Sequence, residues 1–182
     1  MDVVKKNIFL TGSKKVGKTT LINALLPELP RVAGGFFTEA ILGPSGEREG
    51  FQIRLLDGTK QMVAHKKIRS SLQFGHYYVN KKAFETFGVN ALEEALASSG
   101  FVIMDEIGRM EIWAPLFQKA ILRILNSPTH PVIGTLQPHD TPLLNTIRSR
   151  SDVAIVTVTL ENRAEILSTV RAMLGNTSAV LS

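Results

Sequence analysis

Near its N-terminal end the chain reads Gly12-Ser13-Lys14-Lys15-Val16-Gly17-Lys18-Thr19. A glycine, four further residues and then Gly-Lys-Thr is the pattern of a phosphate-binding loop, in which successive backbone N–H groups point inward at phosphate oxygens. The two glycines permit backbone conformations that residues with side chains rarely adopt. In this pattern the Lys18 ammonium reaches the β- and γ-phosphates, and the Thr19 hydroxyl ligates Mg²⁺. The sequence therefore predicts a polyphosphate site at this loop.

The residues on either side of the loop support this interpretation. The apolar run at 7–10 predicts a buried strand, and apolar residues at helical spacing predict a helix over 18–26. A glycine-rich turn that caps an ordinary helix is the alternative, which the order strand, loop, helix disfavours. Lys14 and Lys15 have a second interpretation as solvated loop charges. The residues assigned to nucleotide binding are Gly12, Ser13, Lys14, Lys15, Val16, Gly17, Lys18, Thr19 and Thr20.

Further along, short apolar runs alternate with segments of helical periodicity. Nearly continuous apolar runs predict core strands at 101–104, 131–136 and 153–158, and the periodic segments predict helices at 81–98, 114–125, 143–148 and 164–174. Gly88 is a point at which the first of these helices divides, and Gly175 is expected to end the last. Strands that alternate with helices predict a mostly parallel sheet covered on both faces, a three-layer α/β/α sandwich.

Residues 31–65 have a different pattern. Short β-prone runs are separated by turn residues, among them the hairpin signal Asp57-Gly58, so we expect an antiparallel β insertion there. The basic and aromatic run 66–78 is expected to be a loop. We expect one domain over residues 1–182, with a frayed tail at 176–182.

An acidic pair follows the predicted strand at 101–104. Asp105 and Glu106 then lie at the carboxyl end of a buried strand, where sheets of this class place their ligands. Asp105 is a candidate to hold, together with Thr19, the Mg²⁺ ion. Glu106 is a candidate to deprotonate an attacking water. A solvent-exposed strand end is the alternative, and the phosphate loop upstream argues against it.

Composition narrows the class of protein. The 21 Lys and Arg against 16 Asp and Glu give a net charge of +5, which favours anionic partners, either polyphosphates or nucleic acids. The absence of cysteine excludes disulfides, thiolate metal sites and cysteine nucleophiles. Residues 1–6 do not resemble a signal peptide, and no apolar stretch approaches the roughly 20 residues that span a bilayer. We expect a cytoplasmic protein that does not enter the membrane.

Together these segments resemble the THEP-type nucleoside-triphosphatases, also called cancer-related nucleoside-triphosphatases. Besides the loop, the resemblance rests on the stretches 35–39, 48–51, 75–79, 105–111, 147–150 and 159–163. It implies a P-loop NTPase fold with a RecA-like or kinase-like core. It also implies Mg²⁺ dependence and slow hydrolysis of several nucleoside triphosphates, ATP, GTP, CTP and UTP, to the diphosphate. Family members commonly have proline and glycine where this chain has Lys14 and Lys15, a difference that bears on loop rigidity and substrate affinity.

The transition state of phosphoryl transfer needs further positive charge, which arginines commonly supply. Arg148 and Arg150 leave a predicted helix as a lid arginine would, although cations at a helix C-terminus need no substrate. Arg48 in the insertion is a weaker candidate. Arg109 has two interpretations, a phosphate contact and an ion pair with Glu111.

The candidates for contacts with the base follow the last core strand. The Asn162 amide suits a hydrogen bond to a base edge and the Arg163 guanidinium suits stacking, whereas a cap on the final helix is the alternative for Asn162. The chain lacks an Asn-Lys-x-Asp guanine selector, so loose base choice is expected. His139 is a candidate γ-phosphate sensor or a solvated loop residue.

Other functions remain open at this point. A nucleoside or nucleotide kinase uses the same loop, although no acceptor pocket or arginine-rich lid is obvious. The basic stretch 65–69 followed by Phe74, Tyr77 and Tyr78 is also typical of single-strand binders, which keeps nucleic acid as a disfavoured partner. Slow turnover would equally suit a nucleotide switch that acts through partners. The leading hypothesis is a Mg²⁺-dependent nucleoside-triphosphatase.

Overall fold

The structure is a computed structural model and describes residues 5–178. Its strands are β1 (Asn7–Thr11), β2 (Val32–Leu42), β3 (Arg48–Leu55), β4 (Lys60–His65), β5 (Gln73–Phe74), β6 (Tyr77–Val79), β7 (Phe101–Ile107), β8 (Val132–Leu136) and β9 (Val153–Thr157). The described strands form one nine-stranded sheet in the order β5-β6-β4-β3-β2-β7-β8-β1-β9. Within it, β2, β7, β8, β1 and β9 run parallel, and β3, β4, β6 and β5 extend it with antiparallel pairing.

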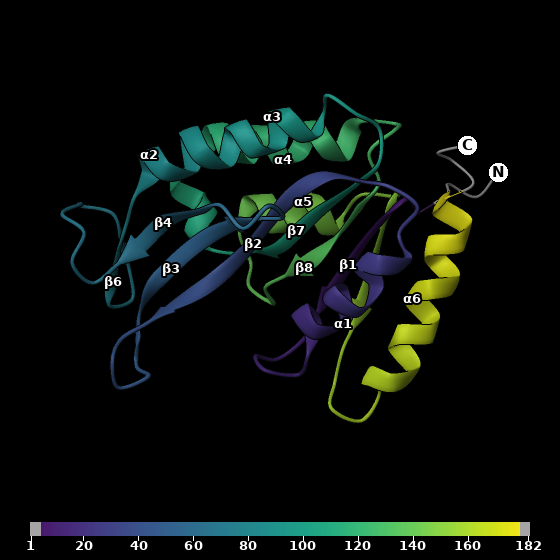
Figure 1. Cartoon of the computed structure of the whole chain (residues 1–182), viewed down its shortest axis with the longest axis horizontal. Helices are drawn as coiled ribbons and strands as arrows, with labels where there is room; N and C mark the ends of the chain where they lie inside the picture. Colours follow the sequence, from purple (N-terminus) through teal and green to yellow (C-terminus); the bar gives the residue numbers. More distant parts are fainter. Residues whose placement is uncertain (1–4, 179–182) are drawn as a thin grey trace.

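Helices cover both faces of this sheet (Figure 1). They are α1 (Lys18–Leu25), α2 (Lys81–Ala83), α3 (Val89–Ala95), α4 (Pro115–Asn126), α5 (Pro142–Arg148) and α6 (Arg163–Ser178). Apolar residues of α1 and α6 pack with Ile8, Ile103 and Ile133 on one face. Apolar residues of α2 to α5 pack with Phe9 and Met104 on the other. The predicted three-layer α/β/α arrangement is therefore confirmed.

The register of the parallel strands brings three chain segments to one edge of the sheet. β8 lies between β1 and β7, pairing Ile133 with both Ile8 and Ile103. Because carboxyl ends of parallel strands meet at the same edge, the loop after β1, the acidic end of β7 and the residue after β8 are neighbours. This edge positions the candidate site.

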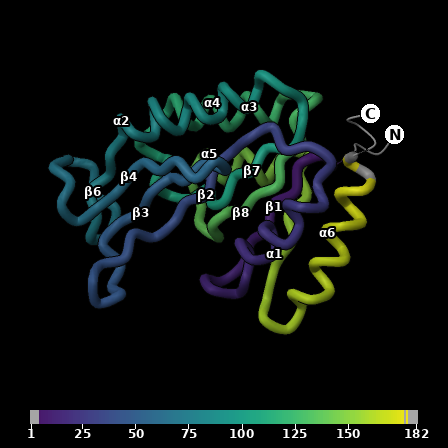
Figure 2. The backbone as a smooth tube through the Cα atoms, in the orientation of Figure 1, coloured from purple at the N-terminus to yellow at the C-terminus, as the bar shows by residue number. Residues whose placement is uncertain are grey.

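The antiparallel part grows out of β2, which belongs to both parts of the sheet. Residues 32–37 pair in parallel with β7, and residues 36–42 pair in an antiparallel manner with β3. Figure 2 shows the chain leaving α1 and running through this long strand into β3 and β4. The antiparallel strands thus continue the parallel sheet and bring β3 beside the site.

The run 66–78 differs from the expected loop, because it contains β5 and most of β6. These strands are only two and three residues long, and β6 pairs with β4 at Ala64 and His65. Strands so short leave no periodicity in the sequence, and they form here because an edge strand offers unpaired N–H and C=O groups. The loop prediction is therefore confirmed for 66–72 and 75–76 and was wrong for 73–74 and 77–78.

Two glycines act differently from one another in the helices. Gly88 ends a π-helical turn (Phe84–Gly88) between α2 and α3, and a Cβ added there would lie 2.8 Å from the Phe117 ring. Gly88 has helical φ and ψ angles of −65° and −43°, so the segment is not broken there and only its hydrogen-bond pattern changes from π to α. The glycine allows close packing on α4. Gly175, in contrast, lies within α6, so the prediction that it ends the helix was wrong. Of the expected frayed tail, 176–178 are helical and 179–182 lie outside the described residues.

Among the helices that the structure describes, none combines the length and apolar content needed to cross a membrane.

Candidate active site

The loop after β1 has the backbone conformation that its glycines were expected to permit. Gly12 and Gly17 have φ angles of 134° and 102°, which side chains disfavour. A Cβ on Gly12 would lie 2.3 Å from the Val158 carbonyl oxygen, so the glycine also allows close contact with the connection between β9 and α6. Lys15 has a φ of 65°, the only positive value at a non-glycine residue in the described chain. The lysine thus occupies a left-handed position, which glycine adopts at lower cost.

Lys18 is the first residue of α1, and its side chain reaches back to the start of the loop. Its ammonium donates to the carbonyl oxygens of Gly12 and Ser13, each at 3.0 Å, and only 9% of the residue is exposed. The same nitrogen lies 3.9 Å from a Glu106 carboxylate oxygen. The loop therefore holds a positive charge directly opposite the acidic end of β7.

Asp105 is buried beside two hydroxyl groups. Its Oδ1 accepts a hydrogen bond of 2.5 Å from the Thr135 hydroxyl. Burial raises the pKa of its carboxyl above the ordinary value, while hydrogen bonds from Thr135 and Thr19 and the charge of Lys18 act in the opposite direction. Thr19 and Asp105, predicted as a metal pair, thus lie close enough for Thr19 to lower the pKa of the Asp105 carboxyl.

The oxygen atoms of this pair fit Mg²⁺, which is typically held by one or two protein oxygens, with phosphates and water completing its shell. No group of three or more His, Cys, Asp or Glu suited to a metal occurs within residues 5–178. An ion at this place would therefore depend on the phosphates of a bound nucleotide for part of its coordination.

Glu106 is held between the phosphate loop and β8. Gln137 Nε2 donates to its Oε1 at 2.8 Å, and its other oxygen faces Lys18. Burial raises the pKa of the Glu106 carboxyl, the Gln137 hydrogen bond and the Lys18 charge lower it, and Asp105 raises it. A carboxylate with a raised pKa and a fixed orientation is suited to accept a proton from water.

Gln137 was not among the predicted site residues. The signal that could have found it is its position directly after the apolar run 131–136, since polar residues at strand ends are candidates for ligand contacts. Gln137 lies close to Glu106 because β8 pairs with β7, and this pairing could not be predicted from the sequence.

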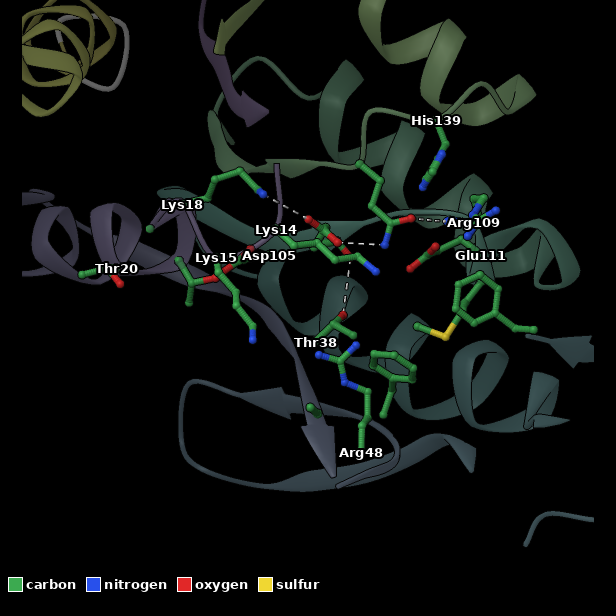
Figure 3. A pocket seen from close by; sticks show the side chains of 18 residues that line it. Lys14, Lys15, Lys18, Thr20, Thr38, Arg48, Asp105, Arg109, Glu111 and His139 are labelled. Atoms are coloured by element: carbon green, nitrogen blue, oxygen red, sulfur yellow. Dashed lines mark hydrogen bonds and ion pairs between the residues drawn. The ribbon is translucent and has the colours of Figure 1, made fainter. Parts of the chain in front are cut away.

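These residues line a cavity of about 400 Å³ that continues beyond Glu106. In Figure 3, Lys18 lies toward one end of the cavity, and Arg109, Glu111 and His139 lie at the other, with Arg48 on the wall formed by β3. The remaining walls of this far part include Phe51 and Phe74. The antiparallel strands therefore complete the site.

Glu111 is almost fully buried at the far end of the cavity, where its carboxylate accepts a hydrogen bond from Gly108 N at 2.9 Å. Burial raises the pKa of the Glu111 carboxyl to about 7. Hydrogen bonds from backbone N–H groups lower this pKa, and the negative charge of Glu106 raises it. Arg109 forms no ion pair with Glu111 among the described side chains. Its guanidinium lies 5.1 Å from the centroid of the Phe74 ring.

The structure does not bring Arg148 and Arg150 into the cavity. Arg148 donates to the carbonyl oxygens of Gln137 and His139, and Arg150 pairs with Asp152 at 2.8 Å. Arg148 therefore binds the backbone of the segment between β8 and α5, and Arg150 stabilises the start of β9. Both differ from the arginines expected to contact phosphate.

The predicted base contacts also have other roles in this structure. The Asn162 side chain accepts from Thr159 N at 2.8 Å and donates to the Thr157 carbonyl oxygen at 3.0 Å. Arg163 is exposed at the start of α6 and does not line the cavity. Both polar ends of the Asn162 amide are thus used within the connection between β9 and α6.

Of the other predicted nucleotide contacts, Lys14, Lys15, Gly17, Lys18, Thr19 and Thr20 line the cavity, together with Asp105 and Glu106. Val16 is buried with the apolar residues of α1. His139 is half-buried and lines the far part of the cavity.

Comparison with known proteins identifies one family. The family described as NTPase matches residues 7–171. The chain is 37% identical to nucleoside-triphosphatase THEP1 of Thermotoga sp. (strain RQ2) over 167 residues, which are 92% of this chain and 94% of that protein. It is 34% identical to the human cancer-related nucleoside-triphosphatase, over 89% of this chain and 93% of the relative.

Solved structures agree with these sequence comparisons. The crystal structure of THEP1 from Aquifex aeolicus matches with a TM-score of 0.81 and 32% identity, over 92% of this chain and 98% of the other. The solution structure of a human cancer-related nucleoside triphosphatase matches with a TM-score of 0.74 and 33% identity, over 91% and 95% of the two chains.

Proposed function

The chain belongs to the nucleoside-triphosphatase family that matches residues 7–171, and from this membership we propose that it hydrolyses nucleoside triphosphates to the diphosphate and inorganic phosphate. The observation that carries the proposal is the position of Glu106, whose carboxylate lies 3.9 Å from the Lys18 ammonium across the phosphate loop. A γ-phosphate bound by Lys18 would then lie beside the carboxylate that accepts the proton of water.

Each polar group of the site has a part in this reaction. Backbone N–H groups of the loop bind the phosphates, and Lys18 leaves the carbonyl oxygens of Gly12 and Ser13 to contact the γ-phosphate. Thr19 and Asp105 are the residues that would hold Mg²⁺. When bound there, the ion supplies positive charge to the phosphate oxygens.

The chemical step uses Glu106 as general base. The water oxygen bonds to the γ-phosphorus, the bond from phosphorus to the β–γ bridging oxygen breaks, and the water proton passes to the carboxylate. Gln137 fixes the orientation of that carboxylate through its 2.8 Å hydrogen bond, and so acts as a positioning residue.

Slow turnover and loose base choice are part of the proposal. Arg148 and Arg150 lie outside the cavity, and the two arginines that line it, Arg48 and Arg109, lie over the Phe51 and Phe74 rings in its far part. Lys18 and the loop amides are therefore the groups that stabilise the charge that builds on the γ-phosphoryl group. NTPases without an arginine in place turn over slowly. The Asn162 amide is already paired within its own connection, so no side-chain amide there is free to select a base.

Phosphate release from ATP, GTP, CTP and UTP, with and without Mg²⁺, tests this function. We expect release from all four at similar rates, dependent on Mg²⁺ and lost in Lys18→Ala. The control is Lys119→Ala, which removes an exposed lysine of α4 away from the cavity and should leave the rate unchanged. Absence of release from any nucleotide, or wild-type release by Lys18→Ala, would contradict the proposal.

A further inference from the structure

The cavity extends beyond the phosphate loop and the acidic end of β7. Beyond Glu106 it continues into a part that we name the distal chamber, lined by Arg48, Phe51, Phe74, Arg109 and Met110. None of these residues belongs to the phosphate loop or to α1 (Figure 3). They come from β3, from β5 and from the segment after β7.

A triphosphate on the loop leaves this chamber free. The Lys18 ammonium, which donates to the Gly12 and Ser13 carbonyl oxygens, faces Glu106 on one side, whereas the connection between β9 and α6 contacts the loop through Val158. Lysine in such a loop contacts the β- and γ-phosphates, so the nucleoside extends away from Glu106, toward α6. In Figure 1 the connection before α6 and the strand β3 lie on opposite sides of the phosphate loop. The distal chamber therefore lies past the γ-phosphate.

The walls of the distal chamber combine two guanidinium groups with two aromatic rings. Arg48 lies 5.3 Å from the centroid of Phe51, and Arg109 lies 5.1 Å from the centroid of Phe74. The two rings are themselves 6.3 Å apart. Neither guanidinium has a carboxylate partner among the side chains that the structure describes, so both are available to an anion.

The acidic group nearby is compatible with an anion in the chamber. Glu111 accepts a hydrogen bond from Gly108 N, and burial raises its pKa to about 7, so the carboxyl is only partly ionised at neutral pH. Its repulsion of a phosphate is therefore smaller than that of an exposed carboxylate.

We propose that the distal chamber binds a second ligand, a phosphomonoester that carries a planar ring, of the nucleoside monophosphate class, while a triphosphate occupies the loop. Arg48 and Arg109 bind its phosphate, since the planar fork of a guanidinium group matches phosphate oxygens geometrically. Phe51 and Phe74 contact its ring, as aromatic side chains do with bases. The inference rests on the proposed function, because it assumes that the triphosphate is bound with its γ-phosphate toward Glu106.

The experiment measures AMP binding to the protein saturated with Mg²⁺ and a β,γ-imido analogue of ATP. Trp113, the single tryptophan, is half-buried in the turn that contains Met110 and provides a fluorescence signal, with calorimetry as a second readout. Adenosine and inorganic phosphate are titrated separately. We expect AMP to bind with one-to-one stoichiometry, and each fragment to bind at least about tenfold more weakly because each loses one set of contacts.

The double variant Arg48→Ala, Arg109→Ala should weaken AMP binding by about a hundredfold, roughly tenfold for each charge-assisted contact, and leave analogue binding intact. The matched control is Arg123→Ala, Arg171→Ala, which removes two exposed arginines that pair with glutamates away from the cavity. We expect AMP affinity within about twofold of wild type in the control.

Three results would overturn the inference alone: no AMP binding to the analogue-loaded protein, equal AMP affinity in the double variant, or inorganic phosphate or adenosine binding as tightly as AMP. Failure of the wild-type protein to bind the triphosphate analogue would overturn the proposed function and this inference together.

Discussion

Substitution of Glu106 by glutamine removes the proposed base while keeping the side-chain length and an oxygen that accepts from Gln137. General-base catalysis contributes about 10²- to 10⁴-fold to a rate, so turnover should fall by at least about 100-fold, or about 2.7 kcal/mol of transition-state stabilisation. Binding should survive, because Lys18 Nζ lies 3.9 Å from the lost carboxylate and donates at 3.0 Å to two loop carbonyl oxygens. Affinity for a triphosphate analogue should be unchanged or higher, since one negative charge beside the γ-phosphate is gone.

Single-turnover phosphate release and analogue binding together test this prediction. The pH dependence adds a second criterion, because the proposed base acts only when ionised. Burial raises the Glu106 pKa above its ordinary value of 4.5, so wild-type turnover should decline toward acid at a pH above 4.5, as the carboxylate gains a proton. The residual activity of Glu106→Gln should lack this decline. Turnover in the variant equal to wild type, or an unchanged acid limb, would refute the assignment of Glu106.

Three further predictions concern neighbouring residues. Glu111 is protonated more readily in the folded state than in the unfolded state. Its stabilising contribution is therefore complete below pH 4.5 and lost as pH rises to about 7, which amounts to about 3 kcal/mol at about 1.36 kcal/mol per pH unit. Chemical denaturation should show this loss in wild type and a smaller one in Glu111→Gln; parallel curves would contradict it. Lys15→Gly relieves a left-handed φ of 65°, whereas position 14 has no positive φ. The free energy of unfolding of Lys15→Gly should therefore be about 1 kcal/mol higher than that of Lys14→Gly. Equal denaturation midpoints would argue against strain at Lys15. Gln137→Ala should lower turnover while analogue affinity stays constant, and a kinetic defect confined to KM would show that it does not act through Glu106.

The sequence predicted the parts of the site that depend on local pattern. The loop glycines, the helix that begins at Lys18 and the buried strand before Asp105 all follow from residues close together in the chain. Asp105 and Thr19 could be predicted to lie close together because the carboxyl ends of parallel strands meet at one edge of the sheet. This inference does not require the order of the strands.

The rest of the site depends on contacts between distant segments. Gln137 reaches Glu106 because β8 lies beside β7, and no local pattern states which strands are neighbours. Arg148 resembles a phosphate-binding arginine in sequence, yet its guanidinium binds the backbone at 137 and 139, because the fold brings the carbonyl oxygens of the segment before α5 within its reach. Phe74 joins the cavity through β5, a two-residue strand that forms only on an existing edge.

The measurement that tests the central claim most directly is a crystal structure with Mg²⁺ and a β,γ-imido triphosphate analogue. The claim is that one triphosphate lies along residues 12–19 with its γ-phosphate between Lys18 and Glu106. We predict the Lys18 ammonium on the γ-phosphate, the ion between Thr19 and Asp105, and a water on the Glu106 carboxylate facing the γ-phosphorus. A triphosphate bound with its γ-phosphate away from Glu106, or bound outside the loop, would contradict this account.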